Sequence, residues 1–134
     1  MALIVQKYGG TSVGSPERIK NVARRVANWQ ARGHQVVVVV SAMSGETNRL
    51  LALAKEVQAH PDSRELDVIA STGEQVTIGL LAMALMDIGV KARSYTGGQV
   101  RILTDSAFTK ARIVSIDEAS IRRALNDGYV VVVA

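Results

Sequence analysis

Five consecutive valines, Val36–Val40, constrain the fold of this chain more than any other feature of its sequence. A β-branched run favours extended backbone, and the absence of polar alternation predicts a strand that is buried on both faces. Strands of this kind occur almost only in parallel sheets that helices cover on both sides. The run therefore predicts an α/β domain, and the 134 residues of the chain suit one such domain.

Strands alternate with helices along most of the chain, a pattern typical of right-handed β-α-β units. Further strands are predicted at residues 2–8, 91–95 and 129–134, and a hairpin at 101–103 and 112–115. Apolar spacing and end signals predict helices over residues 16–30, 47–59, 64–70, 73–88 and 117–126. Ligands bind beyond the carboxyl ends of parallel strands, so the places to search are the loops at residues 9–15, 41–46 and 70–74.

The predicted helix at residues 73–88 is apolar nearly all round, which favours an interior position. Met83 and Met86 are accordingly expected in the core, and so is Trp29 on the predicted helix at residues 16–30. The clearest helix start is at Ser15 and Pro16, where a hydroxyl cap precedes a proline at the first helical position.

The glycine-rich stretch Lys7–Ser15 carries the most chemical information. Gly9 and Gly10 let backbone N–H groups approach a ligand closely, a lysine ends the preceding strand, and a helix N-terminus points back at the loop. Amides, a helix dipole and an ammonium together make an anion site, most often for phosphate. The spacing matches neither the Walker A motif nor the dinucleotide fingerprint, and a tight turn beside a surface lysine explains it equally well.

Two other polar stretches contain candidate ligand contacts. Ser41 ends the valine strand, where its hydroxyl could face a phosphate. Thr47 is a plausible helix N-cap that could instead hold a substrate carboxylate. Glu74 lies where a loop turns into the predicted apolar helix, so it either complements the helix dipole or pairs with the ammonium group of a ligand. From the pattern alone, helix capping by Thr47 and interaction of Glu74 with the helix dipole are favoured over ligand binding.

Composition and charge argue against several other classes. The chain has no cysteine, which excludes disulfides and thiolate metal sites, and His34 and His60 lack a second ligand at metal spacing. The net charge is +4, and residues 1–34 hold six basic residues against one acidic residue. This excess is compatible with an anionic partner, although a solvated helix face explains most of these residues first. The basic residues are not interleaved with aromatic ones, so a nucleic-acid-binding domain is a remote third possibility. No apolar run approaches the roughly 20 residues that span a bilayer, and no signal peptide is recognisable. A soluble, cytoplasmic protein with no membrane partner is expected.

In order along the chain, the stretches Lys7–Val13, Val38–Asn48 and Ser71–Gln75 resemble the aspartate kinases of the amino-acid kinase superfamily. The block Lys-Tyr-Gly-Gly-Thr-Ser is the most specific of the three. The resemblance implies a three-layer αβα fold with an open, mainly parallel sheet. It also implies transfer of the γ-phosphoryl group of ATP to the side-chain carboxylate of L-aspartate, the step that leads toward lysine, threonine, methionine and diaminopimelate.

The resemblance implies a role for particular residues. The ATP phosphates would be bound by Lys7, Tyr8, Gly9, Gly10 and Ser41. Lys7 would also be catalytic, since it would screen the charge of the triphosphate. Glu74 would pair with the ammonium of aspartate and Thr47 would bond a carboxylate, and we expect Lys7 and Glu74 to face each other across one cleft. Mg²⁺ would be held mainly through the nucleotide phosphates, with no metal site on the protein.

The resemblance covers the whole chain but only the first part of the family's catalytic domain. The chain also stops inside an apolar strand, so residues 1–134 are expected to be a fragment that lacks the C-terminal half and the ACT regulatory domains. We expect this fragment alone to be inactive and the longer protein to be a homo-oligomer. The alternative from another class is a non-catalytic α/β module that binds an anion.

Overall fold

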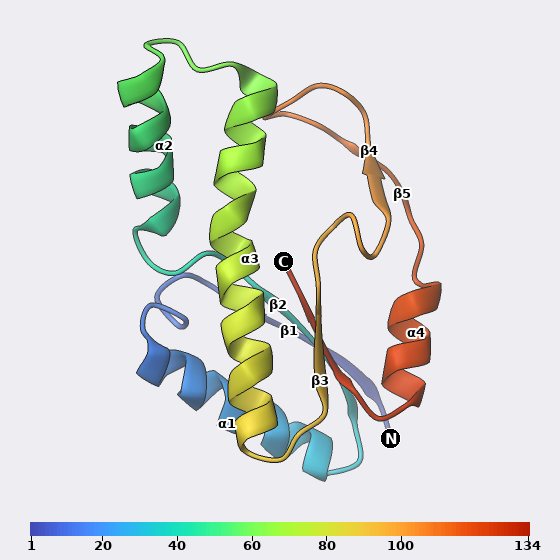
Figure 1. Cartoon of the computed structure of the whole chain (residues 1–134). Coiled ribbons are helices and arrows are strands. Elements are labelled where there is room, and N and C mark those ends of the chain that lie inside the picture. Colours follow the sequence, from blue (N-terminus) through green and yellow to red (C-terminus); the bar gives the residue numbers. More distant parts are fainter.

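The computed structural model describes all of residues 1–134 and is built around a parallel sheet of four strands in the order β1-β2-β6-β3 (Figure 1). The strands are β1 (Leu3–Tyr8), β2 (Gln35–Val40), β3 (Ala92–Tyr95) and β6 (Val130–Val133). Each neighbouring pair is parallel, as the valine run predicts. The predicted α/β fold with a mainly parallel sheet is confirmed.

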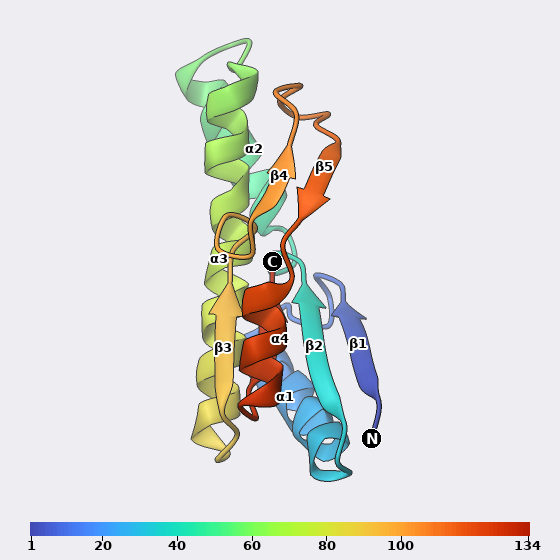
Figure 2. The ribbon, with the colours of Figure 1, turned by 90° about the vertical axis from the view of Figure 1, so that its right-hand side faces the viewer.

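Helices lie on both faces of this sheet (Figure 2). They are α1 (Pro16–Ala31), α2 (Glu46–Val57), α3 (Ser63–Asp87) and α4 (Ala119–Asn126). One core joins α1 and α3 to the sheet through Val36, Val38 and Val132, whereas α4 packs on the other face against Val131 and Val133. The arrangement is αβα, with α2 packed beside α3.

Burial differs between the two valine strands. All four residues of β6 are buried, because α3 covers one of its faces and α4 the other. In β2 only alternate valines are buried, and Val37 and Val39 on the α4 face are half-buried. On β1, Leu3 and Val5 are 49% and 64% exposed. The prediction of burial on both faces is therefore correct for β6 and only half correct for β2, since α4 does not reach over β1.

One continuous helix, α3, replaces the two that were predicted over residues 64–70 and 73–88. The hydroxyls of Ser71 and Thr72 donate to the carbonyl oxygens of Val68 and Ile69, so these polar residues are accommodated without a break. The predicted loop at residues 70–74 is thus helical.

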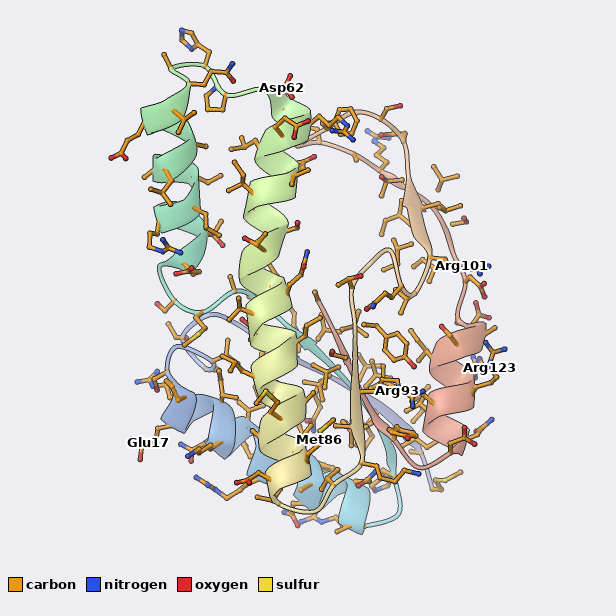
Figure 3. The ribbon with its side chains drawn as sticks, in the orientation of Figure 1. Glu17, Asp62, Met86, Arg93, Arg101 and Arg123 are labelled. Atoms are coloured by element: carbon orange, nitrogen blue, oxygen red, sulfur yellow. The ribbon has the colours of Figure 1, made fainter.

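The interior position predicted for this helix is also wrong. Ile78, Leu81 and Leu85 face the core, but Met83 is 65% exposed. Met86, which Figure 3 labels on the lower part of α3, is 55% exposed. No further layer lies above the outer side of α3, so its apolar outer residues meet solvent. The helix is long and apolar enough to cross a bilayer by composition alone, but its buried side packs on the sheet as a core helix does.

The remaining predictions need smaller corrections. Trp29 is 37% exposed rather than core. The hairpin is confirmed, with β4 (Ile102–Thr104) and β5 (Ile113–Ile116) antiparallel. Its tip is tied to α3 by a hydrogen bond of 2.9 Å from the Thr109 N–H to the Asp67 carboxylate.

Candidate functional site

Three segments that are far apart in the sequence meet at Ala42, just beyond the carboxyl end of β2. A Cβ atom at Gly10 would lie 3.2 Å from the carbonyl oxygen of Ala42. A Cβ atom at Gly73 would lie 2.9 Å from the Cβ of Ala42, closer than such atoms normally approach. Glycine at both positions therefore lets the loop after β1 and the middle of α3 close on the loop after β2.

A polar pocket of about 350 Å³ opens beside this contact. Its lining combines the two loops with the first turn of α2 and comprises Gly10, Thr11, Ser41, Ala42, Met43, Ser44, Gly45, Thr47 and Asn48. We call it the phosphate-side pocket. Small side chains leave main-chain groups accessible there, which suits an anionic ligand.

Thr47 is not the N-cap of α2, so the predicted capping role of this residue is wrong. The helix begins at Glu46, because Gly45 takes a positive φ of 79° as its N-cap and provides no side-chain hydrogen bond. Thr47 lies in the first helical turn and lines the phosphate-side pocket. Its hydroxyl is thus available to a ligand.

The N-terminus of α1 is less available than predicted. The Ser15 hydroxyl accepts a hydrogen bond of 3.2 Å from the Arg18 N–H, and Pro16 has no N–H to offer. Arg18 also donates through Nη1 to the carbonyl oxygen of Thr11 at 2.7 Å, which braces the glycine loop. The uncapped start of α2 is therefore the better source of free N–H donors.

A second pocket, of about 320 Å³, lies beyond the carboxyl ends of β6 and β3. We call it the carboxylate-side pocket; it is lined by Ser71, Glu74, Gln75, Thr96, Gly97 and Ala134. Glu74 is half-buried, and neither a side-chain hydrogen bond nor an ion pair engages its carboxylate. Glu74 lies in the middle of α3 and not in the first turn of a helix. Its carboxylate therefore does not interact with the dipole of a helix N-terminus, which was the structural explanation of this residue.

Lys7 approaches the same edge from the other face of the sheet. In the strand register it lies opposite Val39, which lies opposite Val133, and Val133 belongs to the core beneath α4. Paired residues on neighbouring strands share a face, so Lys7 projects on the α4 side, whereas Glu74 belongs to α3. Neither pocket contains both residues. The expectation that Lys7 and Glu74 face each other across one cleft therefore stays a prediction.

The other residues predicted to bind phosphate do not all line the phosphate-side pocket. Gly10 and Ser41 line the phosphate-side pocket, whereas Gly9 is exposed with open space around it. The ring of Tyr8 packs against the core on the α1 and α3 side, and its hydroxyl donates to Gln6 at 3.0 Å. The Tyr8 side chain is thus engaged within the chain, and its role in ATP binding stays a prediction.

Charged groups near the phosphate-side pocket are largely compensated. Arg49 donates hydrogen bonds to the Glu46 carboxylate, and this contact holds the pKa of Glu46 below its usual value. The Glu46 carboxylate is thus paired with Arg49 at the surface. Across the whole chain, no group of three or more histidine, cysteine, aspartate or glutamate residues converges as a metal site.

From the sequence, Thr96 and Gly97 are predicted only as a turn and Gln75 is given no role of its own, yet all three line the carboxylate-side pocket. Thr96 follows β3 directly, so the rule that ligands bind beyond strand ends would have found it.

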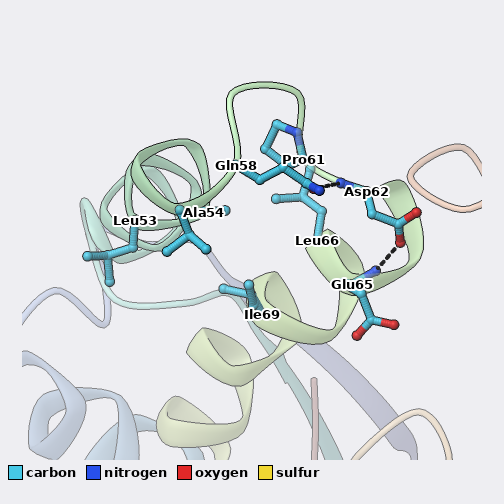
Figure 4. Close-up of a pocket in the computed structure, with 9 residues that line it drawn as sticks. Leu53, Ala54, Gln58, Pro61, Asp62, Glu65, Leu66 and Ile69 are labelled. Atoms are coloured by element: carbon cyan, nitrogen blue, oxygen red, sulfur yellow. Dashed lines mark hydrogen bonds between the residues drawn. The ribbon is translucent and has the colours of Figure 1, made fainter.

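The largest pocket, of about 520 Å³, lies elsewhere, between the end of α2 and the start of α3 (Figure 4). It is mainly apolar, and its polar groups already bond each other: the Asp62 N–H donates to Gln58 Oε1 at 2.8 Å, and the Glu65 N–H donates to Asp62 at 3.1 Å. It contributes nothing to the carboxyl edge of the sheet.

A parallel α/β domain with a glycine loop, an uncapped helix start and a free carboxylate at one edge of its sheet is typical of proteins that bind a small phosphorylated or charged ligand there. The sequence model described as the amino acid kinase family matches residues 2–134. The chain belongs to this family.

Curated relatives are similar over the entire chain. Aspartokinase of Pseudomonas aeruginosa is 66% identical over 134 residues, which are 100% of this chain and 32% of the relative. Aspartokinase of Thermus thermophilus is 50% identical over 134 residues, again all of this chain and 33% of the relative. The chain thus spans about a third of the length of the curated relatives that it matches.

Solved structures show the same fold. Aspartate kinase from Synechocystis superposes with a TM-score of 0.81 at 45% identity, over 98% of this chain and 21% of that one. E. coli aspartokinase III, in a complex with aspartate and ADP, also gives 0.81, at 20% identity and over 99% of this chain and 40% of that one. The second likeness shows the fold alone.

Proposed function

We propose that this chain is part of an aspartate kinase, which transfers the γ-phosphoryl group of ATP to the side-chain carboxylate of L-aspartate and forms ADP and 4-phospho-L-aspartate. The observation that carries the proposal is the meeting of the glycine loop, the loop after β2 and the Glu74 segment at Ala42. The 66% identity to aspartokinases over the full chain supports the particular reaction.

The ATP phosphates would bind at the phosphate-side pocket. Its lack of side chains at Gly10 and Gly45 and the free start of α2 suit phosphate oxygens, and Ser41 adds a hydroxyl. A volume of about 350 Å³ suits the phosphates rather than the whole nucleotide. Lys7 would neutralise phosphate charge from the other face of the sheet edge. Mg²⁺, held through the phosphates, would screen the triphosphate and help to align it.

L-Aspartate would bind between Thr47 and Glu74, through its carboxylate and its ammonium respectively. The unengaged carboxylate of Glu74 supports this role, since a half-buried acid without a partner is suited to a cationic group. The nucleophilic carboxylate has a pKa of about 4 in solution and is ionised at neutral pH. The chain therefore needs no general base, and its task is to position two anionic groups against each other.

A chimera tests this function. Residues 1–134 replace the matching residues of the Pseudomonas aeruginosa aspartokinase, to which they are 66% identical. We expect aspartate-dependent ADP formation within about tenfold of the parent enzyme, and none from the 134 residues alone. A folded chimera that forms no ADP with aspartate would contradict the proposal, and nucleotide binding without turnover would favour a non-catalytic anion-binding module.

The longer protein is also proposed to be a homo-oligomer in the cytoplasm. The support is the apolar outer side of α3, where Val76, Leu80, Met83 and Met86 lie exposed. An exposed apolar stripe of this extent is typical of a protein interface.

A further inference from the structure

The turn that follows β3 is closed by a reciprocal pair of hydrogen bonds between Thr96 and Gln99. The Thr96 N–H donates to Gln99 Oε1 at 2.9 Å, and the Gln99 N–H lies 3.3 Å from the Thr96 hydroxyl oxygen, which accepts from it. The Gln99 and Val100 N–H groups also donate to the Thr96 carbonyl oxygen, both at 3.1 Å. The Thr96 N–H has no main-chain partner, so the Gln99 side chain alone satisfies it.

This turn forms one wall of the carboxylate-side pocket. Thr96 and Gly97 line the pocket together with Glu74, whereas Gln99 is exposed and does not line it. The far end of the turn is anchored, because Val100 is buried in the core beneath α4. Gly97 and Gly98 follow Thr96 in this turn and add no side chain that could restrict it, so the Gln99 side chain is what restricts the near end.

The pocket also presents a donor beside its acid. The Gly97 carbonyl oxygen accepts a hydrogen bond of 2.9 Å from the Ile102 N–H, but the Gly97 N–H donates to no group in the chain. Gly97, whose N–H is unpaired, and Glu74, whose carboxylate is unengaged, thus both line one small pocket. Such a pair complements the carboxylate and ammonium groups of a free amino acid.

We propose that Gln99 is a positioning residue for the amino-acid substrate: it holds Thr96 and Gly97 at the distance from Glu74 that a zwitterion requires. This inference rests on the proposed kinase function. The groups it positions are not the reacting ones, so their contacts are equally strong before and during phosphoryl transfer. Loosening them raises KM for aspartate and leaves kcat unchanged.

The test uses the chimera with Gln99→Leu, which removes the acceptor, and Gln99→Glu, which keeps an acceptor oxygen. Gln58→Leu is the matched control, because Gln58 Oε1 also accepts from a backbone N–H, that of Asp62, but lies in the α2–α3 turn away from both pockets. We expect Gln99→Leu to raise KM for aspartate about fivefold to tenfold, the loss of one such hydrogen bond, with kcat and KM for ATP within about twofold. Gln99→Glu should restore KM to within about twofold, and Gln58→Leu should leave it unchanged.

Three results would overturn the inference: an unchanged KM in Gln99→Leu, equal effects of Gln99→Leu and Gln99→Glu, or the same rise in Gln58→Leu. Each of them leaves the kinase function intact, since the unmodified chimera remains active. An unmodified chimera without activity overturns both proposals. If Gln99→Leu does not fold, Thr96→Val and Thr96→Ser take its place, because only serine keeps the hydroxyl acceptor, and equal KM values for the two variants overturn the inference.

Discussion

Lys7 lies on the α4 face of the sheet edge, in register with Val39 and Val133. Its side chain is exposed, and no hydrogen bond or ion pair holds it. A flexible ammonium beside the end of β1 can follow a phosphate group as its charge changes, which a rigidly paired lysine cannot. The position therefore favours a role in charge stabilisation over a role in folding.

Substitution of Lys7 by alanine separates these roles. In the chimera, Lys7→Ala should lower kcat about 100-fold to 1,000-fold, the usual cost of one lost contact to a developing oxyanion, with little change in thermal stability. Lys55→Ala, an exposed lysine on α2, serves as the control and should leave the rate unchanged. Steady-state ADP formation measures both, and near-normal turnover of Lys7→Ala would remove this lysine from the mechanism.

At the scale of elements, the position of α3 against the loop after β2 assembles the site. The approach is possible because Gly73 has no side chain: a Cβ there would also lie 3.5 Å from Leu50 Cδ1 and 3.6 Å from Glu46 Cγ. Any side chain at this position would push the helix away from Ala42 and widen the space between the two pockets.

The glycines of α3 allow a matched comparison. Gly73→Ala should destabilise the chain by about 1 kcal/mol, because overpacking outweighs the gain in helix propensity. Gly79→Ala, on the same helix with nothing within 4 Å of the new methyl group, should stabilise it by about 0.5–1 kcal/mol. Urea unfolding measures both, and equal stabilisation by the two substitutions would rule out the close approach at Gly73.

Helix α3 also shows which parts of the fold could be predicted from the sequence and which could not. Strand positions and the hairpin follow from local apolar patterns and are confirmed. The stretch Ser71–Gly73 contains weak helix formers and predicts a break, but packing against Ala42 and hydroxyl bonds to the helix backbone override this local preference. The exposure of Met83 could not be predicted, since apolar periodicity does not tell which helices have a second layer above them. For Thr47, the prediction failed by two residues because Gly45 takes the capping position.

At the scale of the whole molecule, the sheet is covered unevenly. One face carries α1 and α3 along its length, whereas α4 covers only part of the other face. Apolar surface remains on the outer side of α3 and on the α4 face of β1. Only the first of these is proposed as an interface between copies of the longer protein.

A charge on the outer side of α3 tests that interface. In the chimera, Met83→Lys should weaken self-association at least tenfold, since Met83 is the most exposed member of the stripe and a buried unpaired ammonium is costly. Val57→Lys, an exposed apolar position on α2, is the control and should sediment like the unmodified protein. Analytical ultracentrifugation measures both, and identical sedimentation of all three would place the oligomer contact elsewhere.

Leu3 and Val5 lie on the side of β1 that α4 does not cover. Their tolerance to substitution therefore depends on the length of the chain. In the 134 residues alone both are surface positions, and a polar replacement would be neutral or would improve solubility. In a longer protein whose further residues pack there, the same replacement would destabilise a core. A mutational scan of the short chain would therefore score as permissive two positions that a scan of the longer chain would score as intolerant.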